Sequence, residues 1–123
     1  MSRILVIDDA ATVRLYHRST LEESGYTVEE AMNGLEAIEK LLVEPFDLYV
    51  VDVNMPKMDG YSFLRQLRGM DIHQAPAIMV STESEAQDQT LAYQAGANLY
   101  LRKPADPETL RNYVAMLLGR TAS

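Results

Sequence analysis

The chain has 123 residues, of which 47% are hydrophobic and 24% charged, so we expect one globular domain over residues 1–123 and exclude disordered and fibrous classes. The absence of cysteine excludes disulfides, thiolate metal sites and cysteine nucleophiles, and the N-terminal apolar run is too short for a signal peptide or a membrane span. We therefore expect a cytoplasmic protein without membrane insertion. Because the net charge of −7 opposes binding to a phosphate backbone, we expect no nucleic-acid partner.

Four short apolar runs have the length of a strand, and segments with helical spacing lie between them. The runs are residues 4–7, 48–51, 77–80 and 99–101. Parallel strands that are covered on both faces are continuously apolar, as these runs are. The alternation therefore predicts an α/β fold built from β-α units around a mostly parallel sheet.

The first predicted helix, over about residues 12–24, has a weak apolar face. Val13, then Tyr16 or His17, then Leu21 would point inward, with His17 as a half-buried packing residue. Gly25 stands where a C-terminal cap is expected, because glycine readily adopts the left-handed conformation of that position. We therefore expect this helix to end just before Gly25.

Three later helices begin at residues that favour a helix N-terminus. These are Asn33, which forms a capping box with Glu36, then Asp59, and then Asp106 with Pro107 after it. The predicted inward rows are Leu35, Ile38, Leu41 and Leu42 in the first, Phe63, Leu64 and Leu67 in the second, and Leu110, Tyr113, Val114, Leu117 and Leu118 in the third.

Residues 85–95 form a further predicted helix that has little to bury. Only Leu91 and Ala95 would point inward, and Gly96 follows as the C-terminal cap. A helix that buries few apolar side chains is one that a domain can move at low cost. We therefore expect this helix to be loosely held.

The side chains that carry chemistry follow the four apolar runs. They are Asp8, Asp9, Asp52, Ser81, Thr82 and Lys103. In an open parallel sheet the carboxyl ends of the strands lie at one edge, so these groups should meet. Three carboxylates repel by roughly 4 kcal/mol per pair at about 4 Å in an effective dielectric near 20, and so require a cation. An all-oxygen site suits Mg²⁺, and Mn²⁺ as well.

Asp52 ends a buried run within the stretch VVDVNMPKMDG, where a carboxylate is held rigidly and meets incoming reagents. A carboxylate can attack phosphorus and form an aspartyl phosphate. Phosphoryl transfer requires mainly positioning and charge neutralisation, which the metal, Lys103 and the hydroxyl of Ser81 would supply. Since the nucleophile is already ionised, no general base is required.

The stretches VIDD, VVDVNMPKMDG and MVST and the pair Lys103-Pro104 together resemble the receiver domain of bacterial two-component response regulators. The resemblance runs in order from Ile4 to about Leu118, and it is strongest to the stand-alone chemotaxis regulators of the CheY type. It implies a flavodoxin-like doubly wound fold: a five-stranded parallel sheet of order 2-1-3-4-5 with helices on both faces.

The resemblance also implies roles for the acidic residues and Asn54. Asp52 would be the phosphoacceptor. Asp9, Asp52 and the backbone carbonyl of Asn54 would bind Mg²⁺ directly, and Asp8 would act through water.

The resemblance implies further roles at the other strand ends. Lys103, Ser81 and Thr82 would bind the phosphoryl group, and the Lys103-Pro104 peptide would be cis. Tyr100 would be the switch aromatic, turning inward when Ser81 is drawn toward the phosphate. Thr82 departs from the small Ala or Gly that is usual in the family, and Ala105 stands where an aromatic is common.

We therefore expect a phosphorylation-activated switch that takes its phosphoryl group from a sensor histidine kinase or a phosphotransfer protein. A downstream protein would read the altered surface of the fourth helix, fifth strand and fifth helix, and the flagellar motor switch is the first candidate. A phosphorelay intermediate or a phosphate sink is the alternative. On this interpretation the protein is not an enzyme, beyond catalysing its own phosphorylation and dephosphorylation.

Two other classes are weighed against the switch. One is a Mg²⁺-dependent phosphohydrolase with an aspartyl nucleophile. Such enzymes of the haloacid dehalogenase type carry a second Asp where this chain has Asn54, and an amide cannot protonate a leaving group. The other is a binding module that has the fold without the chemistry, which the intact acids and Lys103 oppose.

Overall fold

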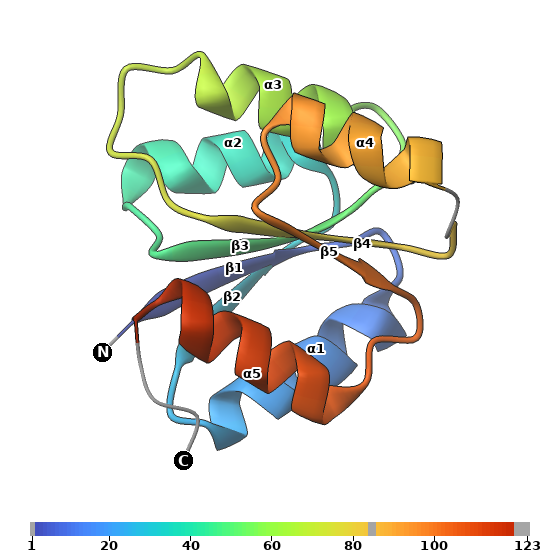
Figure 1. Cartoon of the computed structure of the whole chain (residues 1–123). Helices are drawn as coiled ribbons and strands as arrows, with labels where there is room; N and C mark the ends of the chain where they lie inside the picture. The colour runs from blue at the N-terminus through green and yellow to red at the C-terminus, as the bar shows by residue number, and fades with distance from the viewer. Residues whose placement is uncertain (1, 84–85, 120–123) are drawn as a thin grey trace.

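The computed structural model describes residues 2–83 and 86–119, and within these ranges five strands alternate with five helices (Figure 1). The strands are β1 (Arg3–Ile7), β2 (Thr27–Ala31), β3 (Leu48–Asp52), β4 (Ala77–Ser81) and β5 (Leu99–Arg102). The helices are α1 (Ala11–Glu23), α2 (Gly34–Val43), α3 (Gly60–Arg68), α4 (Ala86–Ala95) and α5 (Pro107–Leu117). None of the helices in this part of the chain is long and apolar enough to cross a membrane.

The strands form one parallel sheet in the order β2-β1-β3-β4-β5, which confirms the predicted fold class. The register aligns the carboxyl ends of the central strands: Ile7 pairs with Val51, and Asp52 pairs with Val80. Residues that follow β1, β3 and β4 therefore emerge at the same edge of the sheet. This alignment places the candidate functional site.

Helices cover both faces of the sheet (Figure 1): α1 and α5 lie on one face, and α2, α3 and α4 lie on the other. Successive residues of a strand point to opposite faces, so each strand supplies two hydrophobic clusters. In β1, Leu5 and Ile7 belong to one cluster, and Ile4 and Val6 belong to the other. Burial on both faces explains why the central strands are continuously apolar.

The predicted helix caps are present. The Asn33 side chain accepts a hydrogen bond from the backbone N–H of Glu36 at 2.9 Å, and Asp59 accepts one from Ser62 at 2.7 Å. Asp106 likewise accepts from the N–H of Thr109 at 3.0 Å. Each bond satisfies a backbone donor that the first helical turn leaves unpaired.

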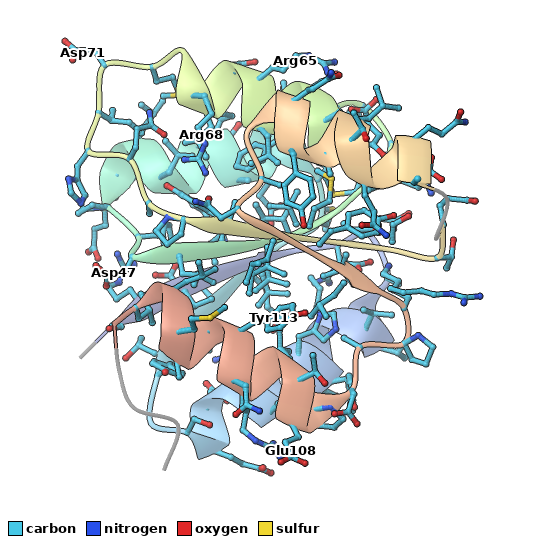
Figure 2. The ribbon with its side chains drawn as sticks, in the orientation of Figure 1. Asp47, Arg65, Arg68, Asp71, Glu108 and Tyr113 are labelled. Atoms are coloured by element: carbon cyan, nitrogen blue, oxygen red, sulfur yellow. The ribbon has the colours of Figure 1, made fainter. Side chains whose placement is uncertain are left out.

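The inward rows were predicted correctly for α3 and α5. Phe63, Leu64 and Leu67 are fully buried in α3. In α5, Leu110 and Val114 are buried, and the partly buried Tyr113 packs against the same cluster on the sheet (Figure 2).

The predicted rows of α2 and α4 were wrong in part. Leu35 and Leu42 of α2 and Leu91 of α4 are 46%, 63% and 48% exposed. The buried positions of α2 are Gly34, Ala37 and Leu41, and those of α4 are Ala92 and Ala95. Small residues on the buried faces let both helices approach their neighbours closely. Leu35, Leu42 and Leu91 lie on the other faces of these helices and point outward.

Helix α1 also departs from the prediction at His17. Tyr16 is exposed, whereas His17 is buried with 2% of its surface exposed, rather than half-buried. Its Nδ1 atom has no hydrogen-bond partner among the described residues. Burial lowers the pKa of His17, because the charged imidazolium would lose its hydration, although the nearby Asp8 carboxylate opposes this shift.

Replacing this histidine should stabilise the protein, most strongly in acid. A lowered pKa means that the unfolded chain binds a proton more tightly, so His17 removes stability as the pH falls below about 6.5. His17→Leu should therefore raise the free energy of unfolding by about 1–2 kcal/mol at pH 7.5, where an unpaired buried group is removed. The gain should be larger at pH 5.5, as measured by urea unfolding at both values.

A matched control is available in His73, which is exposed. His73→Leu should leave the unfolding free energy and its pH dependence close to those of the unsubstituted protein. A His17→Leu protein that is less stable at both pH values would show that the imidazole has a partner in solution.

Candidate functional site

Three carboxylates from two strand ends meet at the edge of the sheet. Asp8 and Asp9 follow β1, and Asp52 ends β3, directly after the paired residues Ile7 and Val51. One carboxylate oxygen from each acid lies within 4.8 Å of the other two. Asp8 and Asp52 are buried, with 2% and 5% of their surface exposed, whereas Asp9 is exposed. The structure thus brings together the acids that the sequence placed after separate strands.

Lys103 brings a positive charge to this cluster. Its Nζ lies 2.8 Å from Asp8 Oδ2 and 2.8 Å from Asp52 Oδ1. The backbone holds the residue as well, since its N–H donates to the Ser81 carbonyl at 2.7 Å. The Lys103-Pro104 peptide is cis, as the family resemblance implied. One ammonium against three carboxylates leaves an excess of two negative charges at the site.

Burial and charge together set the protonation of the site. Burial raises the pKa of Asp52; the hydrogen bond from Lys103 opposes this, and the Asp8 carboxylate adds to it. Burial alone would lower the pKa of Lys103, but its hydrogen bonds to Asp52 and Asp8 outweigh that effect and raise it. Lys103 therefore stays charged at neutral pH. Its single positive charge does not fully offset the burial and the Asp8 repulsion that disfavour the ionised form of Asp52.

The donor set fits a hard divalent cation. Mg²⁺ and Mn²⁺ prefer oxygen ligands, and a cation would offset the negative charge that Lys103 leaves unbalanced. Both carboxylate oxygens of Asp8 are already engaged, Oδ1 by the N–H of Ala10 at 2.9 Å and Oδ2 by Lys103. Asp9 makes no such bond within the described residues. Asp9 and Asp52 are therefore the better candidates for direct ligands, and Asp8 for contact through water.

The chain that follows Asp52 runs unusually close to it. The N–H of Gly60 donates to the Val53 carbonyl at 2.8 Å, and a Cβ added to Gly60 would lie 2.3 Å from the Asp52 backbone oxygen. In the same loop Lys57 has a φ of +69°, and the N–H of Met58 donates to the Pro56 carbonyl at 2.7 Å. The tight turn at Lys57 and the lack of a side chain at Gly60 thus allow the loop between β3 and α3 to pack against the end of β3.

Gly60 was not identified as a positioning residue from the sequence. It stands directly after the helix-capping Asp59, where glycine is unremarkable, and no local pattern shows which backbone atoms will approach it. Asn54, whose carbonyl is an expected metal ligand, lies in the same loop with an exposed side chain.

Ser81 and Tyr100 form hydrogen bonds with the backbone N–H and the backbone carbonyl of the same residue, Glu83. Buried Ser81 accepts a hydrogen bond at Oγ from the N–H of Glu83 at 3.1 Å. The hydroxyl of Tyr100 donates to the Glu83 carbonyl at 2.6 Å. The expected hydroxyl and the expected switch aromatic are therefore linked through a single peptide segment between β4 and α4.

Thr82 is exposed and lines an apolar pocket of about 290 Å³. Tyr16, His17, Lys103 and Ala105 also line this pocket. Ala105 is itself buried, so the pocket occupies space beside a small side chain. The two departures from the family pattern, Thr82 and Ala105, thus lie at one place next to Lys103.

The sequence matches the response regulator receiver domain family over residues 4–115. The transcriptional regulatory protein ResD of Bacillus subtilis is 36% identical over 121 residues, which cover 98% of this chain and 50% of ResD. The response regulator MprA of Mycobacterium ulcerans is 40% identical over 121 residues, which cover 97% of this chain and 51% of MprA. The chain spans about half the length of these relatives.

Solved structures show the same likeness over whole chains. The chemotaxis protein CheY4 of Vibrio cholerae superposes with a TM-score of 0.89 at 34% identity, covering 95% of this chain and 98% of CheY4. The receiver domain of the Francisella response regulator 1452 superposes with a TM-score of 0.91 at 28% identity, covering 97% and 98% of the two chains.

Proposed function

This chain belongs to the response regulator receiver domain family, and we propose that Asp52 is its phosphoacceptor and that Mg²⁺ is its metal. The observation that carries the proposal is the placement of the Asp52 carboxylate. It ends a buried strand, lies 2.8 Å from the Lys103 ammonium and shares a cation-sized cluster with Asp8 and Asp9. The donor is a phosphohistidine of a sensor histidine kinase or a phosphotransfer protein.

In the proposed reaction a carboxylate oxygen of Asp52 attacks phosphorus in line with the bond to the donor imidazole. The oxygen–phosphorus bond forms as the phosphorus–nitrogen bond breaks, and the electron pair leaves on the imidazole nitrogen, which takes a proton from water. Lys103, held by Asp8, faces the charge that builds on the phosphoryl oxygens. Mg²⁺ bound by Asp9, Asp52 and the Asn54 carbonyl would neutralise further negative charge there.

The proposed switch follows from the bonds of Glu83. An acyl phosphate on Asp52 offers new acceptor oxygens, and the Ser81 hydroxyl would donate to one of them. To reach the phosphoryl group the Ser81 hydroxyl would have to move toward Asp52, which would draw Oγ away from the N–H of Glu83, while the Glu83 carbonyl stays bonded to Tyr100. Phosphorylation would thus bias the position of the segment before α4 together with Tyr100, and a partner would read the surface of α4, β5 and α5.

For the output we propose a protein contact of the chemotaxis type, with the flagellar motor switch as first candidate. The likeness to CheY4 over nearly the whole of both chains supports this choice. The similar identity to ResD and MprA supports a different output as one alternative. A role as a phosphorelay intermediate or as a phosphate sink is the other alternative.

The test is incubation with acetyl phosphate and Mg²⁺, followed by intact mass measurement. We expect a gain of one phosphoryl group with Mg²⁺ and almost none when EDTA removes the metal. β-Glycerophosphate should not be turned over, because its alkoxide leaving group needs a proton that Asn54 cannot supply. Brisk Mg²⁺-dependent release of inorganic phosphate from it would instead identify a phosphohydrolase.

A further inference from the structure

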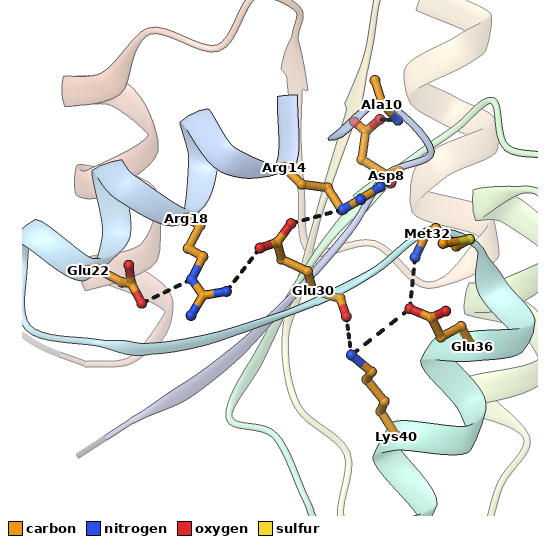
Figure 3. Close-up of polar contacts among 9 residues, drawn as sticks. All are labelled: Asp8, Ala10, Arg14, Arg18, Glu22, Glu30, Met32, Glu36 and Lys40. Carbon is orange, nitrogen blue, oxygen red and sulfur yellow. Dashed lines mark hydrogen bonds and ion pairs between the residues drawn. The ribbon is translucent and has the colours of Figure 1, made fainter. Parts of the chain in front are cut away.

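Arg14 connects the candidate site to the edge strand of the sheet. It is the fourth residue of α1, and its Nη1 donates to the backbone carbonyl of Asp8 at 2.6 Å. Its Nε lies 2.9 Å from Glu30 Oε1 on β2 (Figure 3). The side chain is only 15% exposed, so both contacts are partly shielded from water. A guanidinium can make two such directed bonds at once because its donors form a rigid fork.

Asp8 is held by bonds from four different parts of the chain. Its N–H donates to Ala31 of β2 at 3.0 Å, and its carboxylate binds Ala10 and Lys103. The carbonyl is held by Arg14 alone among the described residues. This carbonyl belongs to the peptide that leads into Asp9, so Arg14 fixes the plane from which the Asp9 side chain departs.

The start of α1 is also held by Asp8, whose carboxylate accepts a hydrogen bond from the N–H of Ala10 at 2.9 Å. The N-cap residue is Ala10, which has no side chain that could cap the helix. The Asp9 carboxylate is exposed and lies within 4.8 Å of two like charges, so repulsion drives it outward. The direction of its backbone is therefore set by Asp8 and, through the Asp8 carbonyl, by Arg14.

We propose that Arg14 is a positioning residue for the acidic site: it holds the Asp8–Asp9 peptide and thereby aims the Asp9 carboxylate at the cation that Asp9 shares with Asp52. This inference rests on the proposed function, since it concerns the same Mg²⁺. Residues that orient metal ligands without touching the metal typically change metal affinity by about 10- to 100-fold when they are lost.

Arg18 provides a matched control on the same helix. It also binds Glu30, through Nη1 at 3.0 Å, and is held by Glu22 at 3.1 Å (Figure 3). Within the part of the chain that the structure describes, Arg18 forms no hydrogen bond with Asp8. Arg14→Gln and Arg18→Gln therefore remove the same charge and one partner of Glu30 each, and only the first removes the bond to the Asp8 carbonyl.

The experiment compares the Mg²⁺ affinity of the unsubstituted protein, Arg14→Gln and Arg18→Gln by titration calorimetry, with thermal unfolding in EDTA as the measure of structure. We expect Arg14→Gln to raise the Kd for Mg²⁺ about tenfold and Arg18→Gln to change it less than about twofold. Phosphorylation of Arg14→Gln by acetyl phosphate should recover at high Mg²⁺, because the acceptor itself is intact. If Arg14→Gln does not fold, Arg14→Lys, which keeps the charge but not the fork, should still bind Mg²⁺ more weakly than Arg18→Gln.

Equal Mg²⁺ affinities of the Arg14 and Arg18 variants would overturn the inference and leave the proposed function standing, provided that the unsubstituted protein binds Mg²⁺ and is phosphorylated. An unsubstituted protein that binds no Mg²⁺ would overturn both.

Discussion

Asp52→Asn should abolish the phosphoryl adduct under conditions that modify the unsubstituted protein completely. The amide keeps the shape of the side chain but has no anionic oxygen to attack phosphorus, and removal of a nucleophile typically costs more than about 10³-fold in rate. Intact mass after incubation with acetyl phosphate and Mg²⁺ measures the loss directly. Thermal unfolding checks that the variant is folded.

The control for this variant is Asp71→Asn. Asp71 is exposed in the connection after α3, far from the cluster at the sheet edge (Figure 2). This variant should take up one phosphoryl group at the rate of the unsubstituted protein. An adduct of undiminished yield on Asp52→Asn would place the acceptor elsewhere, and peptide mapping would then identify it.

Gly60→Ala should damage both stability and phosphorylation. The added Cβ would lie 2.3 Å from the Asp52 backbone oxygen and 3.0 Å from two further backbone atoms, so the end of β3 must move. Overpacking of this kind costs roughly 1–3 kcal/mol in the free energy of unfolding. Displacement of the reacting carboxylate by about 1 Å would lower the rate of phosphorylation up to about 10²-fold. Urea unfolding and the time course of intact mass measure the two effects.

Gly69, at the other end of α3, is the matched control. A Cβ added there would meet its nearest atoms at 3.6 Å, an ordinary contact, and the residue has a φ of −86° that alanine also adopts. Gly69→Ala should change stability by less than about 0.5 kcal/mol and leave phosphorylation unchanged. If Gly60→Ala behaved in the same way, the close approach to Asp52 would not constrain the site.

The buried central strands were predictable because burial on both faces leaves a continuous apolar run. Strand β2 left no such run: its sequence is TVEEA, and it pairs only with β1 at the edge of the sheet. Glu29 and Glu30 are tolerated there because arginines from β1 and α1 bind them. Long-range ion pairs of this type cannot be seen in a local pattern, so the strand was implied only by the family resemblance.

The helix faces show a second limit of sequence patterns. Counting large apolar residues placed Leu35 and Leu42 inward, but α2 packs through Gly34 and Ala37. Close packing rewards small residues where a helix lies near its neighbours, and a hydrophobicity pattern does not record that distance.

The candidate site was predictable where chemistry follows strand ends. The rule that parallel strands end at one edge of a sheet predicts that Asp8, Asp9, Asp52 and Lys103 meet. Their supports were not predictable, because Arg14 and Gly60 act through backbone atoms whose proximity only the folded chain creates. The orphaned Nδ1 of His17 is equally a property of its surroundings.

The most direct measurement of the central claim is the anomalous diffraction of Mn²⁺ in crystals of the unsubstituted protein. Mn²⁺ shares the oxygen-rich coordination that Mg²⁺ prefers and can be located by its own scattering. We predict one strong anomalous peak in contact with the carboxylates of Asp9 and Asp52. A strong peak elsewhere on the molecule, with none at these two residues, would contradict the account.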